Sequence, residues 1–150
     1  MPAISGGSAL DALGDQELYE EQPLPANGEA QAFTSGEAIA PFKIQSQGEG
    51  NFLVKLVVAS TGDPVMTIFV RGGEDFEASV PLGTYVVKYA SGTHWYGYDH
   101  LFGDHHTGYS KADETFNFVQ DGDTIRGFSI TLYAVEGGNL TTSTLSAGEF

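Results

Sequence analysis

The sequence contains no cysteine, which excludes disulfide bonds, thiolate catalysis and cysteine-ligated zinc or iron–sulfur sites. Basic residues are also scarce: six Lys and Arg stand against 20 Asp and Glu, and the formal net charge is −14. This charge repels phosphate groups, so we expect no nucleic-acid partner and no anionic membrane surface. No apolar run is long enough to span a bilayer, and the first residues lack the basic and apolar regions of a secretory signal.

Motifs of catalysis are missing as well. There is no GxSxG sequence around a serine and no HExxH sequence for a catalytic zinc. Asp121-Gly122-Asp123 lacks the further ligands of a calcium-binding loop and is better explained as a hairpin turn. We therefore predict that the protein is not an enzyme and uses no cofactor.

Two regions differ in composition. Residues 1–40 contain seven carboxylates, no Lys or Arg, and many Ser, Gly, Ala, Gln and Pro residues, which is typical of an extended acidic arm. A short helix over residues 9–19 is a weaker expectation within it, because Gly14 interrupts the helical spacing of leucines. An arm of this kind is either a disordered tail or a segment that a neighbouring subunit holds in place. Residues 41–150 are predicted to form the folded domain.

Apolar residues alternate with polar ones from residue 41 onward, which predicts β-strands. Residues 51–59 are apolar on both faces and should form a central strand, whereas Phe42 and Ile44 indicate a short first strand at an edge. Further strands are expected at residues 65–70, 76–80, 84–90, 115–120, 124–135 and 140–145. These seven or eight strands predict an all-β fold, a single antiparallel β-sandwich, with a small β-barrel as the alternative.

Residues 91–111 form the segment richest in side chains that could bind a ligand or a metal, because they hold the only Trp, three of the seven Tyr and all four His. Long loops of this composition often carry binding functions. Imidazole nitrogens suit zinc, nickel or copper, although the spacing here matches no established metal motif. The candidate metal ligands are His94, His100, His105 and His106.

The aromatic residues of the same segment allow two interpretations. They could form a platform for a glycan or a protein partner, because flat rings give a large contact area at low entropic cost. The candidate binding residues are Trp95, Tyr96, Tyr98, Phe102 and Tyr109. Alternatively, a loop folded over the sandwich needs its own small core, for which Trp95 and Phe102 are the best candidates. Gly97, Gly103 and Gly108 would then provide positive φ angles at its turns.

Six stretches of the domain carry a resemblance: NFLVKLV, GDPVMTIFVRGG, VPLGTYVVKYASGTHWYG, HLFG, YSKADETFNF and ITLYAVEGGNL. The run they span, residues 52–145, resembles a family of small, uncharacterised all-β domains in bacterial and phage-encoded proteins. THWYG and YSKAD are its most specific parts, and VPLGTYVV is also distantly similar to prealbumin-like modules of surface proteins. The resemblance implies a β-sandwich associated with envelopes or particles, and it implies no catalytic residues.

These observations favour a structural or assembly protein that is tethered by residues 1–40. A component of a phage virion, of the decoration or fibre type, or of a bacterial surface assembly fits the acidic arm and the lack of catalytic motifs. Its partners would be other proteins or further copies of the chain. The alternative is a module that binds a glycan, a peptide or a metal through residues 94–109. A virion or surface location is favoured over insertion into a membrane.

Overall fold

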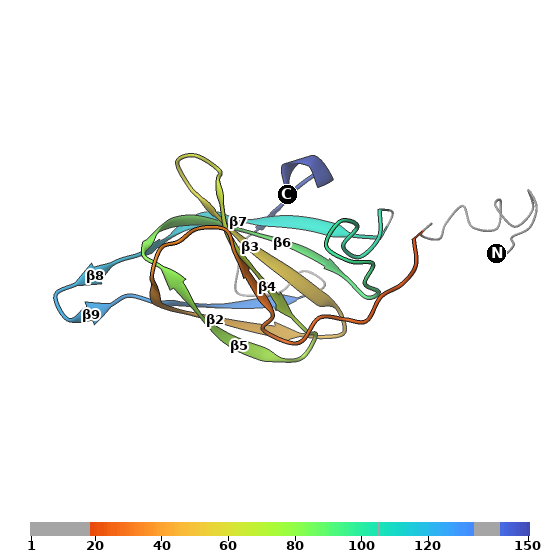
Figure 1. Cartoon of the computed structure of the whole chain (residues 1–150), viewed down its shortest axis with the longest axis horizontal. Coiled ribbons are helices and arrows are strands. Elements are labelled where there is room, and N and C mark those ends of the chain that lie inside the picture. Colours follow the sequence, from red (N-terminus) through yellow and green to blue (C-terminus); the bar gives the residue numbers. More distant parts are fainter. Residues whose placement is uncertain (1–18, 105, 134–141) are drawn as a thin grey trace, which may run out of the picture.

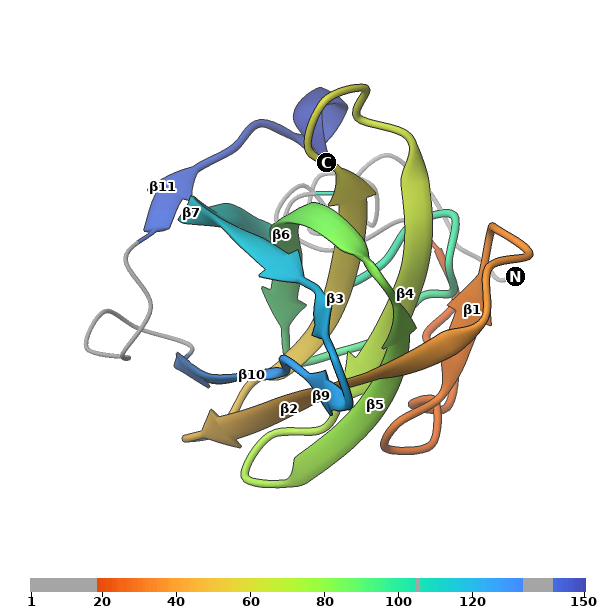
Figure 2. The same ribbon diagram turned by 90° about the vertical axis from the view of Figure 1, so that its left-hand side faces the viewer.

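The structure, a computed structural model, describes residues 19–104, 106–133 and 142–150. Two β-sheets face each other across a hydrophobic core and do not close into a barrel (Figures 1 and 2). The prediction of an all-β sandwich is therefore confirmed. In the described residues the only helical element is a short 3₁₀ turn, η1 (Ala147–Glu149).

The larger sheet has six strands in the order β1-β4-β3-β6-β7-β11, and all of its pairs are antiparallel. Its strands are β1 (Ala30–Ala32), β3 (Asn51–Val58), β4 (Pro64–Val70), β6 (Gly83–Gly92), β7 (Gly108–Phe118) and β11 (Thr142–Thr144). As predicted, residues 51–58 lie at the centre of the sheet and a Thr-rich strand near the C-terminus lies at its edge.

The smaller sheet has the order β10-β2-β5 and consists of β2 (Ala38–Gln47), β5 (Asp75–Pro81) and β10 (Phe128–Tyr133). A separate hairpin, β8 (Gln120–Asp121) with β9 (Thr124–Ile125), projects from one end of the molecule (Figure 1). Its turn includes Gly122 at a φ of 63°, which confirms the hairpin expected at Asp121-Gly122-Asp123.

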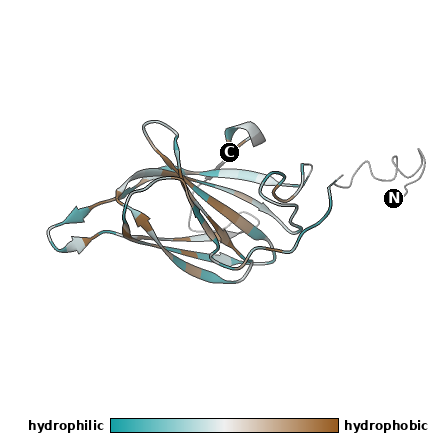
Figure 3. Cartoon of the chain, in the orientation of Figure 1, coloured by the Kyte–Doolittle hydropathy of each residue, from teal (hydrophilic) through white to brown (hydrophobic). Residues whose placement is uncertain are grey.

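Alternation of side chains explains how the sheets pack. On β3, Phe52, Val54 and Leu56 are fully buried against the smaller sheet, while Leu53 packs into a second cluster on the opposite face. β4 likewise contributes Ile68 and Val70 to the core between the sheets and Phe69 to the second cluster on the outer face. Hydrophobic residues accordingly concentrate along the strands of both sheets (Figure 3). The six-stranded sheet is thus covered on two sides, by the smaller sheet on its inner face and by loops and chain ends on its outer face.

Several strand predictions need correction. The strand containing Phe42 and Ile44 is not an edge: β2 has ten residues and lies between β10 and β5. β10 runs parallel to β2, so the sandwich is not purely antiparallel. β7 begins at Gly108, within the predicted loop, because its first half is polar and gives no alternating apolar signal.

The predicted strand over residues 124–135 is divided between β9 and β10. Gly127 lies between the two strands, and a Cβ atom at this position would stand 2.4 Å from the carbonyl oxygen of Pro41. The chain can approach β2 this closely only at a glycine. The first two residues of the strand expected at 140–145 lie outside the described residues, as does nearly all of the weak helix expected at residues 9–19.

The described part of the acidic arm lies on the domain. β1 pairs with β4, and β2 already begins at Ala38, before the predicted boundary at residue 40. Gln22 also forms an isolated β-bridge with Trp95. We call residues 19–33 the N-terminal strap, because they run along the edge of the six-stranded sheet and the loop beside it.

Replacing Phe42 by Ala tests the core. Phe42 is fully buried and its ring lies 5.6 Å from that of Phe118, between the two sheets. We expect a loss of about 3–5 kcal/mol in the free energy of unfolding, because the cavity cannot fully collapse. Urea unfolding would measure it. Lys43→Ala, at the exposed neighbouring position, should change stability by less than about 0.5 kcal/mol. Equal effects of both substitutions would contradict the orientation of β2, with Phe42 facing the core and Lys43 facing solvent.

Candidate functional site

Residues 93–104 and 106–107 fold over the outer face of the six-stranded sheet, where the loop contributes to a second hydrophobic cluster. Its buried members are Leu53, Phe69, Ala90, Trp95, Leu101 and Phe102. The Trp95 ring lies edge-on to Phe69 and Phe102, with ring centroids 5.1 Å and 5.2 Å apart. Gly92 permits this close packing, since a Cβ atom there would stand 2.3 Å from the Cβ of Phe102.

This burial decides between the two interpretations of the aromatic residues for Trp95 and Phe102. Their exposed fractions are 3% and 1%, so neither ring offers a face to a glycan or partner. Both belong to a loop core, as the alternative predicted. Tyr96, Tyr98 and Tyr109 are partly buried.

Turn geometry in the loop also differs in part from the prediction. Gly97 and Gly103 adopt positive φ angles of 96° and 101°, but Gly108 is the first residue of β7. The third left-handed residue is Leu101, at a φ of 53°. It is held there because its main-chain N–H donates to Gly97 and its carbonyl accepts from Tyr96.

Two of the candidate metal ligands contact the N-terminal strap. The Nδ1 atom of His94 lies 3.0 Å from a carboxylate oxygen of Glu21. The His100 ring stacks on Tyr19 with centroids 3.5 Å apart, and its Nδ1 lies 3.8 Å from an Asp104 oxygen. These contacts join the loop to the strap.

The remaining histidines complete no metal centre among the residues that the structure describes. His105 lies outside these residues, and His106 is exposed. No group of three His, Asp or Glu side chains converges on one point within the described ranges. The loop therefore supplies no described donor set for zinc, nickel or copper.

The N-terminal strap is fastened to the end of β4 by Arg71. Its Nε donates to the carbonyl oxygen of Pro25 at 2.8 Å, and its Nη2 donates to that of Leu24 at 3.2 Å. A little further along, the main-chain N–H of Gln22 donates to the carbonyl of Trp95 at 2.7 Å. A basic side chain thus holds main-chain oxygens of the strap.

Three lysines form a row across the outer face of the six-stranded sheet. Lys55 on β3 is the register partner of Lys88 on β6, which is in turn the partner of Lys111 on β7. The row continues on the other side of Lys55 to Thr67 on β4 and Gln31 on β1. Half of the six basic residues of an acidic protein are therefore aligned on neighbouring strands. We call Lys55, Lys88 and Lys111 the lysine row.

The C-terminal segment, residues 146–150, lies across this row. Lys55 Nζ donates to the main-chain oxygen of Phe150 at 2.8 Å, and Lys88 Nζ donates to the carbonyl oxygen of Glu149 at 2.6 Å. The ammonium of Lys55 also stands 5.1 Å from the centroid of the Phe150 ring, within the range of a cation–π contact. In the described residues no Lys or Arg forms a salt bridge with an Asp or Glu side chain. Lys55 and Lys88 instead donate hydrogen bonds to the main chain of the C-terminal segment.

Three pKa values are shifted by the surroundings of these side chains. Burial lowers the pKa of Lys55, and the nearby charge of Lys88 lowers it further. The pKa of Glu149 is lowered by hydrogen bonds from the main-chain N–H and the hydroxyl of Ser146, and by the charges of Lys111 and Lys88. The pKa of Tyr98 is raised, chiefly by burial and also by its 2.6 Å hydrogen bond to Glu29.

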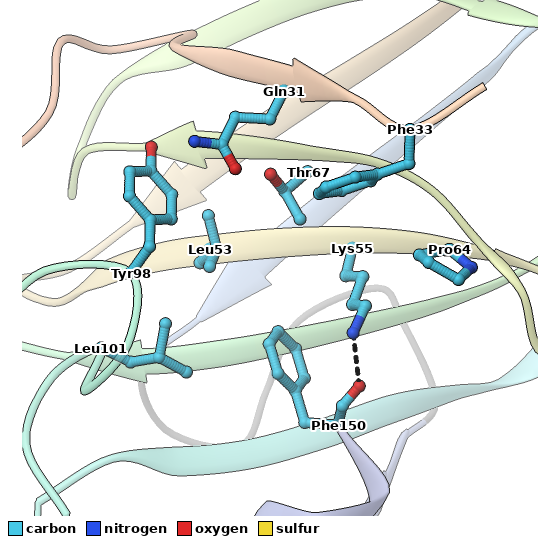
Figure 4. Close-up of a pocket in the computed structure, with 9 residues that line it drawn as sticks. All are labelled: Gln31, Phe33, Leu53, Lys55, Pro64, Thr67, Tyr98, Leu101 and Phe150. Atoms are coloured by element: carbon cyan, nitrogen blue, oxygen red, sulfur yellow. Dashed lines mark hydrogen bonds between the residues drawn. The ribbon is translucent and has the colours of Figure 1, made fainter. Parts of the chain in front are cut away.

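A pocket of about 330 Å³ lies between the two chain ends on the outer face (Figure 4). It is lined by Gln31, Phe33, Leu53, Lys55, Pro64, Thr67, Tyr98, Leu101 and Phe150. Lys55 is the only charged residue among them. The Thr67 hydroxyl is buried and has no hydrogen-bond partner among the described residues.

Sequence reasoning missed the lysine row and this pocket. A signal was present, because Lys55 and Lys88 each interrupt an otherwise apolar strand. Their alignment depends on strand order and register, which join residues 33 positions apart. The role of Phe150 had no local signal at all.

Comparison with family models, curated proteins and solved structures finds no match to this chain. The resemblance to small bacterial and phage β-domains remains a prediction. Within the described residues, no helix has the length and apolar character needed to cross a membrane.

Replacing Trp95 by Ala should weaken the fold. The substitution removes the centre of the second cluster, so we expect a loss of about 3–5 kcal/mol in urea unfolding. His94→Ala, whose side chain is 65% exposed, is the matched control and should change stability by less than about 0.5 kcal/mol. A Trp95→Ala protein as stable as the native one would mean that the ring contributes little to the core.

Glu149 provides a test of the docked C-terminal segment. Its pKa should lie below the ordinary value of 4.5 in the folded protein. The turn over residues 146–149, and to a lesser extent the attraction of its carboxylate to Lys111 and Lys88, is therefore favoured above a pH of about 4.5 and weakens as the pH falls through the lowered pKa. An NMR titration of the Glu149 carboxyl would measure this, with a peptide of residues 142–150 as the reference. Ser146→Ala should raise the pKa part of the way toward 4.5; an unchanged pKa in this variant would contradict the hydrogen bonds from Ser146 to Glu149.

Proposed function

We propose that this chain is a non-enzymatic structural domain that assembles through its terminal segments. One observation carries the proposal: three of the six basic side chains hold main-chain oxygens of the chain ends. Arg71 holds Leu24 and Pro25 of the N-terminal strap, while Lys55 and Lys88 hold the C-terminal segment.

Such contacts suit exchange between copies of the chain. A carbonyl oxygen is present in every extended segment, so the same lysines can hold the equivalent segment of a neighbour. The lysine row also selects for acidic segments, because three adjacent ammonium groups repel one another until negative charge approaches. Segment exchange forms oligomers at a small cost in free energy, since it reuses contacts that the monomer already makes.

The acidic arm has the chemistry of such a segment. Residues 1–40 carry seven carboxylates and no basic residue, which complements the lysine row of another copy. Tyr19 and Phe33 are 40% and 50% exposed, and they are two of the three large apolar residues exposed in the described part of the chain. Arm and lysine row together offer charge complementarity and apolar anchors.

A component of a phage virion, of the decoration or fibre type, or of a bacterial surface assembly is the setting we propose. The resemblance of residues 52–145 to small bacterial and phage β-domains supports it. The lack of nucleophile and metal-protease motifs in the sequence agrees with a role without catalysis. The acidic surface keeps such a component soluble before assembly.

Light scattering tests the proposal directly. The full-length chain at high concentration should have the mass of a defined oligomer, whereas a chain that lacks residues 1–18, and with them three of the seven carboxylates of the arm, should form a smaller oligomer or a monomer. Lys88→Glu should also reduce the mass, because a carboxylate would repel an incoming acidic segment.

Lys43→Glu is the matched control, since it makes the same charge change at an exposed position of the smaller sheet. It should leave the mass unchanged. Monomers for all four proteins at every concentration would contradict the proposal, as would an equal loss of mass in both charge variants.

A further inference from the structure

The pocket on the outer face has the features of a small-ligand site, which goes beyond a role in assembly. Its volume of about 330 Å³ is at the small end of the range for ligand pockets, about 300–1,000 Å³. Phe33 of the N-terminal strap bounds one side and Phe150 of the C-terminal segment bounds another (Figure 4). Because both neighbouring surfaces are already taken by the chain itself, the space suits a compact molecule rather than a continuing peptide.

Lys55 sets the charge of the ligand. It is the only charged residue in the lining, and its neighbour Lys88 adds positive potential along the row. An ammonium has three N–H donors, of which one is used on the main-chain oxygen of Phe150. No Asp or Glu side chain of the described residues pairs with Lys55, so no acidic side chain competes with a ligand carboxylate for its remaining N–H groups.

Thr67 provides an independent indication. Its side chain belongs to the lining, the residue is only 6% exposed, and its hydroxyl makes no hydrogen bond within the described part of the chain. A buried hydroxyl without a partner is unusual, because it loses its hydration without gaining a hydrogen bond in return. Thr67 is the register partner of Lys55, so the two side chains project from neighbouring strands on the same face of the sheet.

Access of a ligand to this hydroxyl requires movement of a neighbouring side chain. Its oxygen is covered in the present arrangement. Gln31, the register partner of Thr67 on β1, is exposed and also lines the pocket. Its side chain can turn aside while the main chain of β1 keeps its pairing with β4.

Apolar surface makes up most of the remaining lining, including Leu53, Leu101 and the two phenylalanines. We propose that this pocket binds a small monocarboxylate with an apolar body, whose carboxylate pairs with the Lys55 ammonium and accepts a hydrogen bond from the Thr67 hydroxyl. The apolar body lies between Phe33 and Phe150 against Leu53. Binding of such a ligand would tie the two chain ends to the sheet.

The test is a titration of the full-length protein, followed by calorimetry and by amide NMR shifts. The probe is 3-phenylpropionate, with 3-phenylpropanamide as the neutral molecule of the same shape and acetate as the charge without the apolar body. We expect saturable binding of 3-phenylpropionate with shifts at β3, β4 and β1. The amide should bind about tenfold more weakly, since it lacks the ion pair, and acetate should not saturate.

Two variants locate the contacts. Lys55→Met keeps most of the side-chain length and should weaken binding by about tenfold or more, while Lys43→Met, at the exposed site on β2, should not change it. Thr67→Val keeps the shape and should weaken binding by about fivefold. Because it removes an unpaired buried hydroxyl, Thr67→Val should leave the melting temperature equal or higher, which separates loss of binding from loss of fold.

Several outcomes would overturn the inference. Equal binding of the amide and the carboxylate would exclude a role for the Lys55 charge, and saturable acetate binding would show a simple anion site on the lysine row. Native affinity in Lys55→Met, or shifts confined to residues outside the pocket, would also reject it. The oligomeric mass of the protein does not enter this test, so its failure would leave the proposed assembly function unaffected.

Discussion

The central strands of the six-stranded sheet are apolar on both faces, and most of the structure follows from the need to cover them. β3 turns Phe52, Val54 and Leu56 toward the smaller sheet and Leu53 toward the opposite side. A sandwich of two sheets covers only one face of each. The outer face of β3 and β4 must therefore be covered by something other than a third sheet, and the loop over residues 93–104 and 106–107 supplies the cover.

This requirement explains why the most aromatic segment of the chain is largely structural. Trp95 fills the space above Phe69, and Phe102 closes the cluster against Gly92. The loop is fixed to the strap by the Gln22–Trp95 bridge and by the stacking of Tyr19 on His100. Its histidines lie at the rim of this cover, where they contact the strap.

The cover is incomplete where the lysine row crosses the sheet, and the chain ends fill the gap. An ammonium on a sheet face that is otherwise covered needs acceptors, because burial removes its hydration. Lys55 and Lys88 find them in the main chain of residues 149 and 150. Chain ends held by a few hydrogen bonds are more easily exchanged than strands held by a full ladder. The same arrangement thus favours both contacts between copies and a pocket beside Lys55.

Local patterns in the sequence determined the fold class and most of the strands. Alternation within a strand depends only on neighbouring residues, so the central position of residues 51–58 and the inward faces of β5 and β6 could be predicted. A turn such as Asp121-Gly122-Asp123 is equally local, because glycine alone relieves its positive φ angle.

Tertiary structure alone decided the position of β2 between two strands, its parallel pairing with β10, and the division of residues 124–135 at Gly127. The lysine row and the pocket depend on the same kind of information. They bring together Gln31, Lys55, Thr67, Lys88 and Phe150, which no local period connects. Register between strands is fixed by packing across the whole core, and a pattern confined to one strand carries no record of its neighbours.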